Sequence, residues 1–160
     1  MLLIFNGSIC RRLAMPRFDQ DIMVRLVAEL RKSVARLGDL AGISEAAFLK
    51  DPDKIGSAKY HFIVAIECCI DMCNHVIARN GFRAPEDYGD TFRVMSETGA
   101  FKPGFSDELV NMAKFRNRLV HLYWEVEDRM VYEILQTRLA DFKKLMDALA
   151  KFLNFKDIKR

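Results

Sequence analysis

The stretch from Phe62 to Arg79 reads FIVAIECCIDMCNHVIAR and predicts a long helix with one broad apolar side. Asp51 followed by Pro52 is typical of a helix start, and Asn80-Gly81 is typical of a helix end. We therefore expect one helix from Asp51 to about Arg79. Its buried side should consist of the apolar residues that recur at helical spacing, namely Phe62, Ile66, Cys69, Ile70, Cys73, Val76 and Ile77.

Helical periodicity continues over most of the remaining chain, and no stretch shows convincing strand alternation or an internal repeat. The pattern predicts an all-α fold, a four-helix antiparallel bundle with an extra short helix. The other expected segments are residues 19–40, a short turn from residue 44, residues 88–98, residues 107–123 with Ser106 as the cap, and a last helix after residue 124 that continues to about residue 152.

The composition is that of a globular protein. The chain has 160 residues, of which 51% are apolar and 29% charged, and its formal net charge is +3. This balance excludes a disordered chain and provides enough apolar residues for one buried core. The mild positive charge allows a polyanionic partner without requiring one, because dedicated nucleic-acid modules usually carry a stronger basic cluster.

We expect one helical domain over residues 18–155, a loosely attached extension at residues 1–17 and a short tail at residues 156–160. The extension is not a signal peptide, because its apolar run is too short and its positive charges follow that run. Met15 and Met23 are plausible alternative starts. No segment approaches the roughly 20 apolar residues needed to cross a bilayer. Cytoplasmic localisation and no membrane partner are therefore expected.

The four cysteines do not form the pattern of a disulfide framework or a zinc site. They contain no Cys-x-x-Cys pair, and three of them share one apolar helical segment. We expect reduced cysteines that act as small core residues. They are Cys10, Cys68, Cys69 and Cys73.

Residues 116–124 read RNRLVHLYW and concentrate side chains that can act on a phosphate. Cleavage of RNA by transesterification needs a base for the 2′-hydroxyl, an acid for the leaving 5′-oxygen and positive charge near the phosphorus. His121 can fill either proton-transfer role, and Arg116 offers donors matched to phosphate oxygens. One such set is incomplete, whereas a symmetric dimer would bring two sets together.

Helix geometry separates the two main groups of this motif. Arg116 and His121 lie about 140° apart around an ideal helix, whereas Asn117 and His121 share a face. We therefore expect Arg116 to reach round the helix with its long side chain, or the helix to distort near His121.

The motif resembles that of a known family. Arg116-Asn117 followed by His121 is similar to the Arg-x-x-x-x-His signature of HEPN-superfamily ribonucleases. The continuation to Tyr123 resembles the HepT-like toxin branch in particular. Two further blocks, at residues 65–78 and 84–89, are also similar to that branch, and the likeness covers roughly residues 20–153.

The resemblance implies a function as well as a fold. It implies a HEPN-type bundle that forms a homodimer with the motifs at its interface, and a metal-independent endoribonuclease toxin that leaves 2′,3′-cyclic phosphate ends and needs no cofactor. In that function Arg116 and His121 are catalytic and Asn117 supports them. A cognate minimal nucleotidyltransferase antitoxin is implied as partner, in a larger hetero-oligomer, and it would transfer AMP to Tyr123.

Structural interpretations of the same residues stay open at this point. His121 could be a buried histidine bonded to a backbone carbonyl, Arg116 an ion-pairing arginine, and Tyr123 a core or interface aromatic. Glu67, Asp71 and His75 share helical spacing, but we do not expect them to form a metal site. Instead, we expect Asp71, Asn74 and His75 to form a polar lining or a dimer contact. At the level of function, the alternatives are a non-catalytic subunit that partners a nucleotidyltransferase and a general RNA-binding domain.

Overall fold

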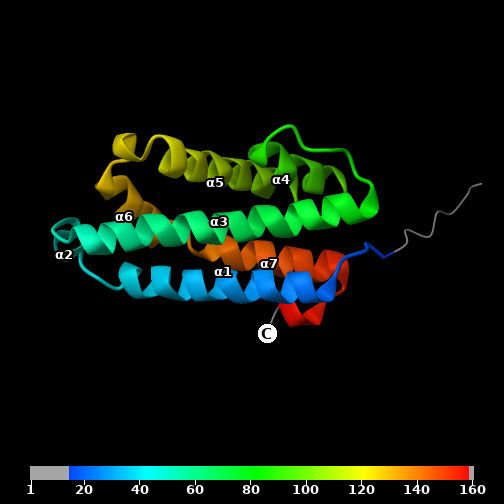
Figure 1. The fold of residues 1–160 in the computed structure, drawn as a ribbon, viewed down its shortest axis with the longest axis horizontal. Coiled ribbons are helices and arrows are strands. Elements are labelled where there is room, and N and C mark those ends of the chain that lie inside the picture. The colour runs from blue at the N-terminus through cyan, green and yellow to red at the C-terminus, as the bar shows by residue number, and fades with distance from the viewer. Residues whose placement is uncertain (1–14, 159–160) are drawn as a thin grey trace, which may run out of the picture.

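The computed structural model describes residues 15–158, and every regular element in that range is helical (Figure 1). This confirms the all-α prediction. The elements in chain order are α1 (Gln20–Ala41), α2 (Glu45–Leu49), α3 (Pro52–Asn80), α4 (Tyr88–Glu97), α5 (Pro103–His121), the 3-10 turn η1 (Tyr123–Glu125), α6 (Asp128–Thr137), α7 (Ala140–Leu153) and the 3-10 turn η2 (Lys156–Ile158).

The ends of α3 lie where the sequence predicts them. The Asp51 side chain accepts hydrogen bonds from the backbone N–H groups of Asp53 and Lys54, and Pro52 occupies the first turn, where a missing N–H costs nothing. At the other end, Gly81 adopts a left-handed conformation with φ of 62°, and its N–H donates to the Ile77 carbonyl. Glycine suits this position because it has no Cβ to clash.

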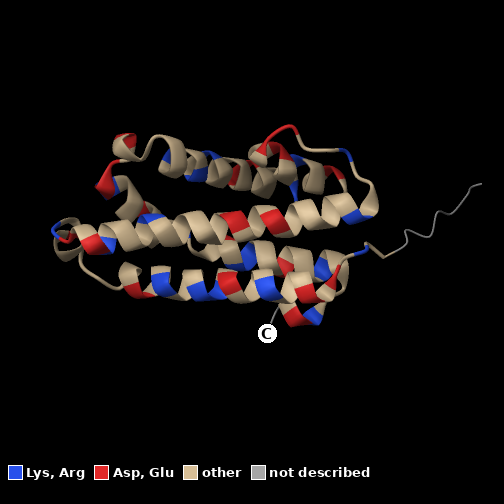
Figure 2. Cartoon of the chain, viewed as in Figure 1, with Lys and Arg blue, Asp and Glu red and all other residues tan. Residues whose placement is uncertain are grey.

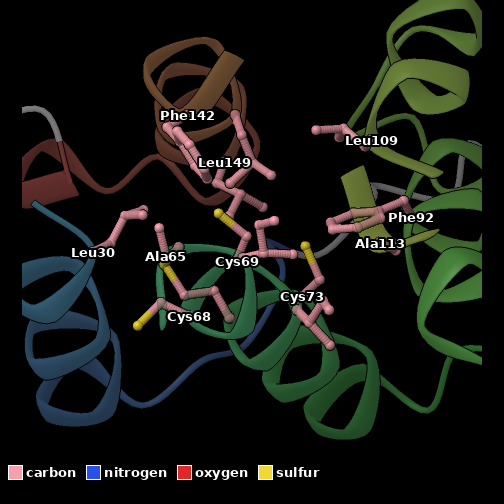
Figure 3. Close-up of a cluster of buried hydrophobic side chains, with 14 of the residues drawn as sticks. Leu30, Ala65, Cys68, Cys69, Cys73, Phe92, Leu109, Ala113, Phe142 and Leu149 are labelled. Atoms are coloured by element: carbon pink, nitrogen blue, oxygen red, sulfur yellow. The ribbon is translucent and has the colours of Figure 1, made fainter. Parts of the chain in front are cut away.

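Helix α3 is the central element of the bundle. It contacts α1, α4, α5, α6 and α7, and it runs antiparallel to α1, its most extensive neighbour (Figure 1). Figure 3 shows side chains from α1, α4, α5 and α7 converging on its apolar side. The core residues shown there include Leu30, Ala65, Cys69, Cys73, Phe92, Leu109, Ala113, Phe142 and Leu149.

Three of the cysteines are free and buried on α3, as predicted. Burial raises the pKa of Cys68 to about 11, and it raises the pKa of Cys73 as well. Both therefore remain neutral thiols that pack as small apolar groups. Cys10 lies outside the described residues.

Of the described helices, α3 alone is long and apolar enough to cross a membrane by length and composition. Within its most apolar window, 56% of the residues are buried inside the fold. This burial and the contacts above are typical of a core helix. Figure 2 shows that positively and negatively charged residues both occur along α1 and along α3.

One residue of the predicted N-terminal extension and one residue of the predicted C-terminal tail form hydrogen bonds with the helices. Residues 1–14 lie outside the described residues, but Arg17 is tied to the end of α3. Its backbone N–H donates to Asn80 Oδ1 at 2.8 Å, and Asn80 Nδ2 donates back to its carbonyl at 2.9 Å. At the other end of the chain, Ile158 is buried, and its carbonyl accepts from Arg31 of α1 at 2.6 Å.

Two expected helix boundaries are wrong. Helix α5 begins at Pro103 rather than residue 107, with Lys102 as the capping residue. Ser106 is therefore not the cap. It is buried within the first turns of α5, and its hydroxyl donates to the Phe92 carbonyl of α4 at 3.2 Å. At the far end, α5 stops at His121, and Tyr123 begins a separate 3-10 turn.

The expected single last helix is also wrong, because it is divided into α6 and α7. Arg138 leaves helical geometry with φ of −120°, next to Thr137, whose hydroxyl donates to the Glu133 carbonyl at 2.7 Å. The spacing of the apolar residues gives no sign of this break. The buried residues Leu135 and Phe142 are seven positions apart, which equals about two helical turns.

The buried position of Ser106 can be tested by substitution. An aspartate is an equally good capping residue, so Ser106→Asp would be tolerated if Ser106 capped α5. In the observed fold it places a carboxylate in the core. We expect a loss of unfolding free energy of at least about 1–3 kcal/mol, measured by urea denaturation. Ser106→Ala, which loses only the bond to Phe92, should cost about 1 kcal/mol. Wild-type stability of Ser106→Asp would contradict this account.

Candidate functional site

The motif residues occupy the last turns of α5 and the 3-10 turn that follows. Arg116, Asn117 and His121 belong to α5, which ends when Leu122 adopts φ of −135°. The chain then turns, and Tyr123 and Trp124 form η1. The end of the helix therefore separates the Arg116 and His121 groups from Tyr123, which no longer continues the helical face.

Arg116 is nearly buried and held by other side chains. Its side chain is 11% exposed and forms an ion pair with Glu67 of α3. Its Nη1 donates to Asn117 Oδ1 at 3.1 Å, and its Cζ lies 4.8 Å from the ring centroid of Tyr88 on α4. Burial lowers the pKa of Arg116 from its ordinary value. Nε is buried and has no hydrogen-bond partner among the described residues.

His121 lies at a surface pocket, so the interpretation of His121 as a buried histidine is wrong. The imidazole is exposed, and it lines a shallow pocket of about 290 Å³ together with Asn117, Asp87 and Tyr88. Asn117 and His121 thus share a face, as their spacing predicts. Arg116 does not line this pocket, but it touches two residues that do, Asn117 and Tyr88.

Tyr123 and Trp124 are largely solvent-exposed, which excludes a core role for Tyr123 within one chain. Their exposed fractions are 61% and 67%, and their rings meet edge to face with centroids 5.3 Å apart. Arg118 packs on the same turn, since its guanidinium lies 3.5 Å from the Glu125 carbonyl and 3.8 Å from the sulfur of Met130. A phenol this exposed on a short turn is accessible to another protein.

The polar side chains of α3 serve different neighbours rather than one shared site. Glu67 pairs with Arg116, and His75 Nε2 accepts from the Asp19 N–H at 2.8 Å. Asn74 accepts from the Thr91 hydroxyl at 3.1 Å. Within residues 15–158, no group of three or more His, Cys, Asp and Glu side chains is arranged to hold a metal ion.

Three residues around the motif were not identified as site residues from sequence. Tyr88 and Asp87 lie in the block at residues 84–89 that resembles the family, and Glu67 lies in the block at residues 65–78, but the sequence pattern assigns none of them a role in the site. Glu67 lies 49 positions from Arg116. Periodicity describes one helix at a time, so it gives no signal for a contact between helices so distant in the chain.

His75 predicts a pH dependence of stability. Burial lowers its pKa and the charge of Arg79 lowers it further, while Asp19 opposes the shift. The unfolded state therefore takes up a proton first, and stability falls as the pH drops below the ordinary pKa of 6.5. We expect a lower urea midpoint at about pH 5.5 than at about pH 7.5.

A matched variant isolates the contribution of His75. Gln at position 75 keeps a hydrogen-bond acceptor but does not titrate, so His75→Gln should show a smaller loss between the two pH values. Burial also lowers the pKa of His61. His61 therefore contributes its own loss of stability between the two pH values, and this loss remains in His75→Gln. An equal loss in wild type and His75→Gln would contradict the assignment.

Comparison with known families and proteins gives a consistent result. A family model described as "Ribonuclease HepT-like" matches residues 30–149. The chain is 26% identical over 129 residues to the mRNA nuclease HepT of Shewanella oneidensis, an alignment that covers 81% of this chain and 96% of that protein.

Solved structures show the same fold. The tri-AMPylated HEPN toxin of Shewanella oneidensis in complex with MNT antitoxin matches with a TM-score of 0.77 and 25% identity, covering 83% of this chain and 99% of that one. A toxin–antitoxin crystal structure with AMP-PNP matches with a TM-score of 0.75 and 24% identity, over 82% and 98%. A cytosolic protein of unknown function from Bacillus subtilis, YutE, matches with a TM-score of 0.68 and 19% identity, over 84% and 92%.

Proposed function

This chain belongs to the HepT-like ribonuclease family, and on that premise we propose that it is a metal-independent endoribonuclease toxin whose site is formed by Arg116, Asn117 and His121. The observation that carries the proposal is the shared pocket of Asn117 and His121, with the nearly buried Arg116 in contact with two of its lining residues. The imidazole is open to a substrate, and the guanidinium is anchored beside it. We also propose that the protein acts in the cytoplasm.

The chemistry assigned to these groups is transesterification. The ribose 2′-oxygen attacks phosphorus while its proton passes to a base, and the bond from phosphorus to the 5′-oxygen breaks as an acid protonates that oxygen. The products are a 2′,3′-cyclic phosphate and a free 5′-hydroxyl. His121 transfers a proton, Arg116 stabilises the negative charge that develops on the phosphate, and Asn117 supports both.

A homodimer would complete this machinery. One chain provides one His121, whereas the mechanism needs a base and an acid at the same phosphate. Val120 and Leu122, on either side of His121 in the sequence, are apolar yet 38% and 37% exposed. Exposed apolar side chains beside an incomplete site are suited to packing against a second copy across a two-fold axis.

The proposed partner is a cognate minimal nucleotidyltransferase antitoxin that transfers AMP to Tyr123. The phenol oxygen would attack the α-phosphorus of ATP, pyrophosphate would leave, and the phenol proton would be released. Tyr123 is exposed enough for this reaction. The added phosphodiester would place negative charge and bulk near the pocket of His121, which opposes entry of an RNA phosphate. Toxin and antitoxin would assemble into a larger hetero-oligomer.

One observation favours a second candidate, a non-catalytic subunit that partners a nucleotidyltransferase. The ion pair with Glu67 neutralises the charge of Arg116, the residue assigned to the RNA phosphate. In this alternative Arg116 has a structural role, and the exposed Tyr123 turn is the functional part of the surface.

Growth of cells that express the chain separates the two candidates. Expression of the chain alone should arrest growth if it is a ribonuclease, and His121→Ala should abolish the arrest. Co-expression of the nucleotidyltransferase encoded beside it should restore growth to cells carrying the wild-type chain. Unimpaired growth with the wild-type chain alone, at the same protein level, would favour the non-catalytic subunit.

A further inference from the structure

The guanidinium of Arg116 is held by side chains from two other helices. Glu67 of α3 forms an ion pair with Arg116. The ring centroid of Tyr88, on α4, lies 4.8 Å from the Cζ atom of Arg116. Both partners approach a side chain that is only 11% exposed. The position of Arg116 therefore depends on three helices rather than on α5 alone.

We propose that Glu67 and Tyr88 are positioning residues of the ribonuclease site, which fix the direction of the Arg116 guanidinium relative to the pocket of His121. This inference rests on the proposed function. It assigns no proton transfer or phosphate contact to Glu67 or Tyr88, since each acts through Arg116.

The need for such residues follows from helix geometry. Arg116 and His121 point about 140° apart around α5, so the helix alone does not direct them to one phosphate. A long arginine side chain has many rotamers, and an unrestrained one loses entropy whenever it binds. Contacts from outside α5 that select one rotamer in advance remove that loss from the reaction.

Tyr88 is suited to connect Arg116 to the pocket. It contacts the guanidinium and also lines the pocket with Asn117 and His121. Its placement is set by a close approach of α4 to α5, because a Cβ added at the neighbouring Gly89 would lie 3.3 Å from Val110 Cγ1. Figure 1 shows the segment before α4 running back along the bundle, which brings the start of α4 over α5.

Glu67 is suited to neutralise the positive charge of Arg116 while leaving some of the guanidinium N–H groups without a partner. A buried guanidinium needs a compensating partner, and a carboxylate is the strongest one that proteins offer. A guanidinium carries more N–H groups than the contacts with Glu67 and Asn117 use. Nε is buried, so it is the remaining Nη hydrogens that can donate to a phosphate oxygen while Glu67 keeps the planar group oriented.

The test pairs a conservative and a disruptive variant at each position. Tyr88→Phe keeps the ring and should cleave RNA with a kcat within about twofold of wild type, whereas Tyr88→Leu should lose about tenfold. Glu67→Ala should lower kcat by about tenfold or more, without raising KM, because it also removes a negative charge that repels RNA. Glu67→Gln, which keeps an acceptor, should lie between Glu67→Ala and wild type.

Matched controls come from the same helix as Glu67. Asp53→Ala removes an exposed carboxylate from the first turn of α3, and Tyr60→Leu removes an exposed tyrosine whose ring is not the one that faces the Arg116 guanidinium. Both controls should retain wild-type kcat. Circular dichroism and urea midpoints confirm that the variants fold. If Glu67→Ala is unstable, Glu67→Gln and the Tyr88 pair still decide the question.

A second readout follows the guanidinium itself. Nitrogen-15 NMR of arginine side chains should show restricted rotation of Arg116 in wild type and Tyr88→Phe, and averaged signals in Glu67→Ala and Tyr88→Leu. Wild-type kcat in both disruptive variants, or a loss in Tyr88→Phe equal to that in Tyr88→Leu, would overturn the inference and leave the ribonuclease assignment standing. Absence of RNA cleavage by wild type would overturn both, and restricted NMR signals would then show a structural contact only.

Discussion

His121→Ala is expected to lower the rate of RNA cleavage by about 10²- to 10⁴-fold, the range over which a general acid or base contributes to catalysis. His121 is exposed and shares its pocket with Asn117, so the substitution removes the proposed proton-transfer group without opening the core. In a homodimer the substitution would remove both imidazoles at once. The rate is measured on a labelled single-stranded RNA under single-turnover conditions.

Two comparisons make the His121 result specific. Lys114→Ala removes an exposed cation from α5 and should retain most of the activity. The urea midpoint of His121→Ala should match that of wild type, because surface substitutions usually change stability by less than about 0.5 kcal/mol. Retention of more than half of the wild-type rate by His121→Ala would exclude a proton-transfer role for His121.

Tyr123→Phe is expected to abolish modification by the antitoxin. The variant loses the phenol oxygen that would accept AMP and keeps the ring that packs edge to face on Trp124. The chain co-expressed with the proposed nucleotidyltransferase antitoxin should gain mass in whole AMP units, and Tyr123→Phe should show no such gain. Intact-protein mass spectrometry measures this directly.

Tyr60 provides the matched control, since its side chain has the same 61% exposed fraction as Tyr123 and lies on α3. Tyr60→Phe should carry the same added mass as the wild-type chain. Unchanged mass of the wild-type chain in a stable complex would point to neutralisation by steric binding. Added mass on Tyr123→Phe would place the modification on another residue.

Much of the fold could be predicted from local sequence signals. Asp51, Pro52 and Gly81 mark the ends of α3 through hydrogen bonds and backbone conformations that involve nearby residues only. Signals of this kind can be read without knowing the fold. The apolar spacing that predicts the buried side of α3 is equally local, and each of the seven residues named for that side is buried.

The sequence-based predictions are wrong or incomplete where the structure depends on contacts between different helices. Serine is a common capping residue, but the hydroxyl of Ser106 donates a hydrogen bond to the Phe92 carbonyl of α4. The break at Arg138 preserves apolar spacing on both sides, so no periodic pattern reveals it. Glu67 and Tyr88 reach Arg116 from helices that are distant in sequence. The motif could thus be found from sequence, whereas the side chains that hold it required the structure.

In the proposed mechanism, this chain cleaves RNA without a metal through Arg116 and His121. The most direct measurement is cleavage of a defined RNA in the presence of excess EDTA, with analysis of the product ends. We predict 2′,3′-cyclic phosphate and 5′-hydroxyl ends from the wild-type chain, and no such products from His121→Ala. Cleavage that stops in EDTA, or products with 5′-phosphate ends, would contradict this mechanism.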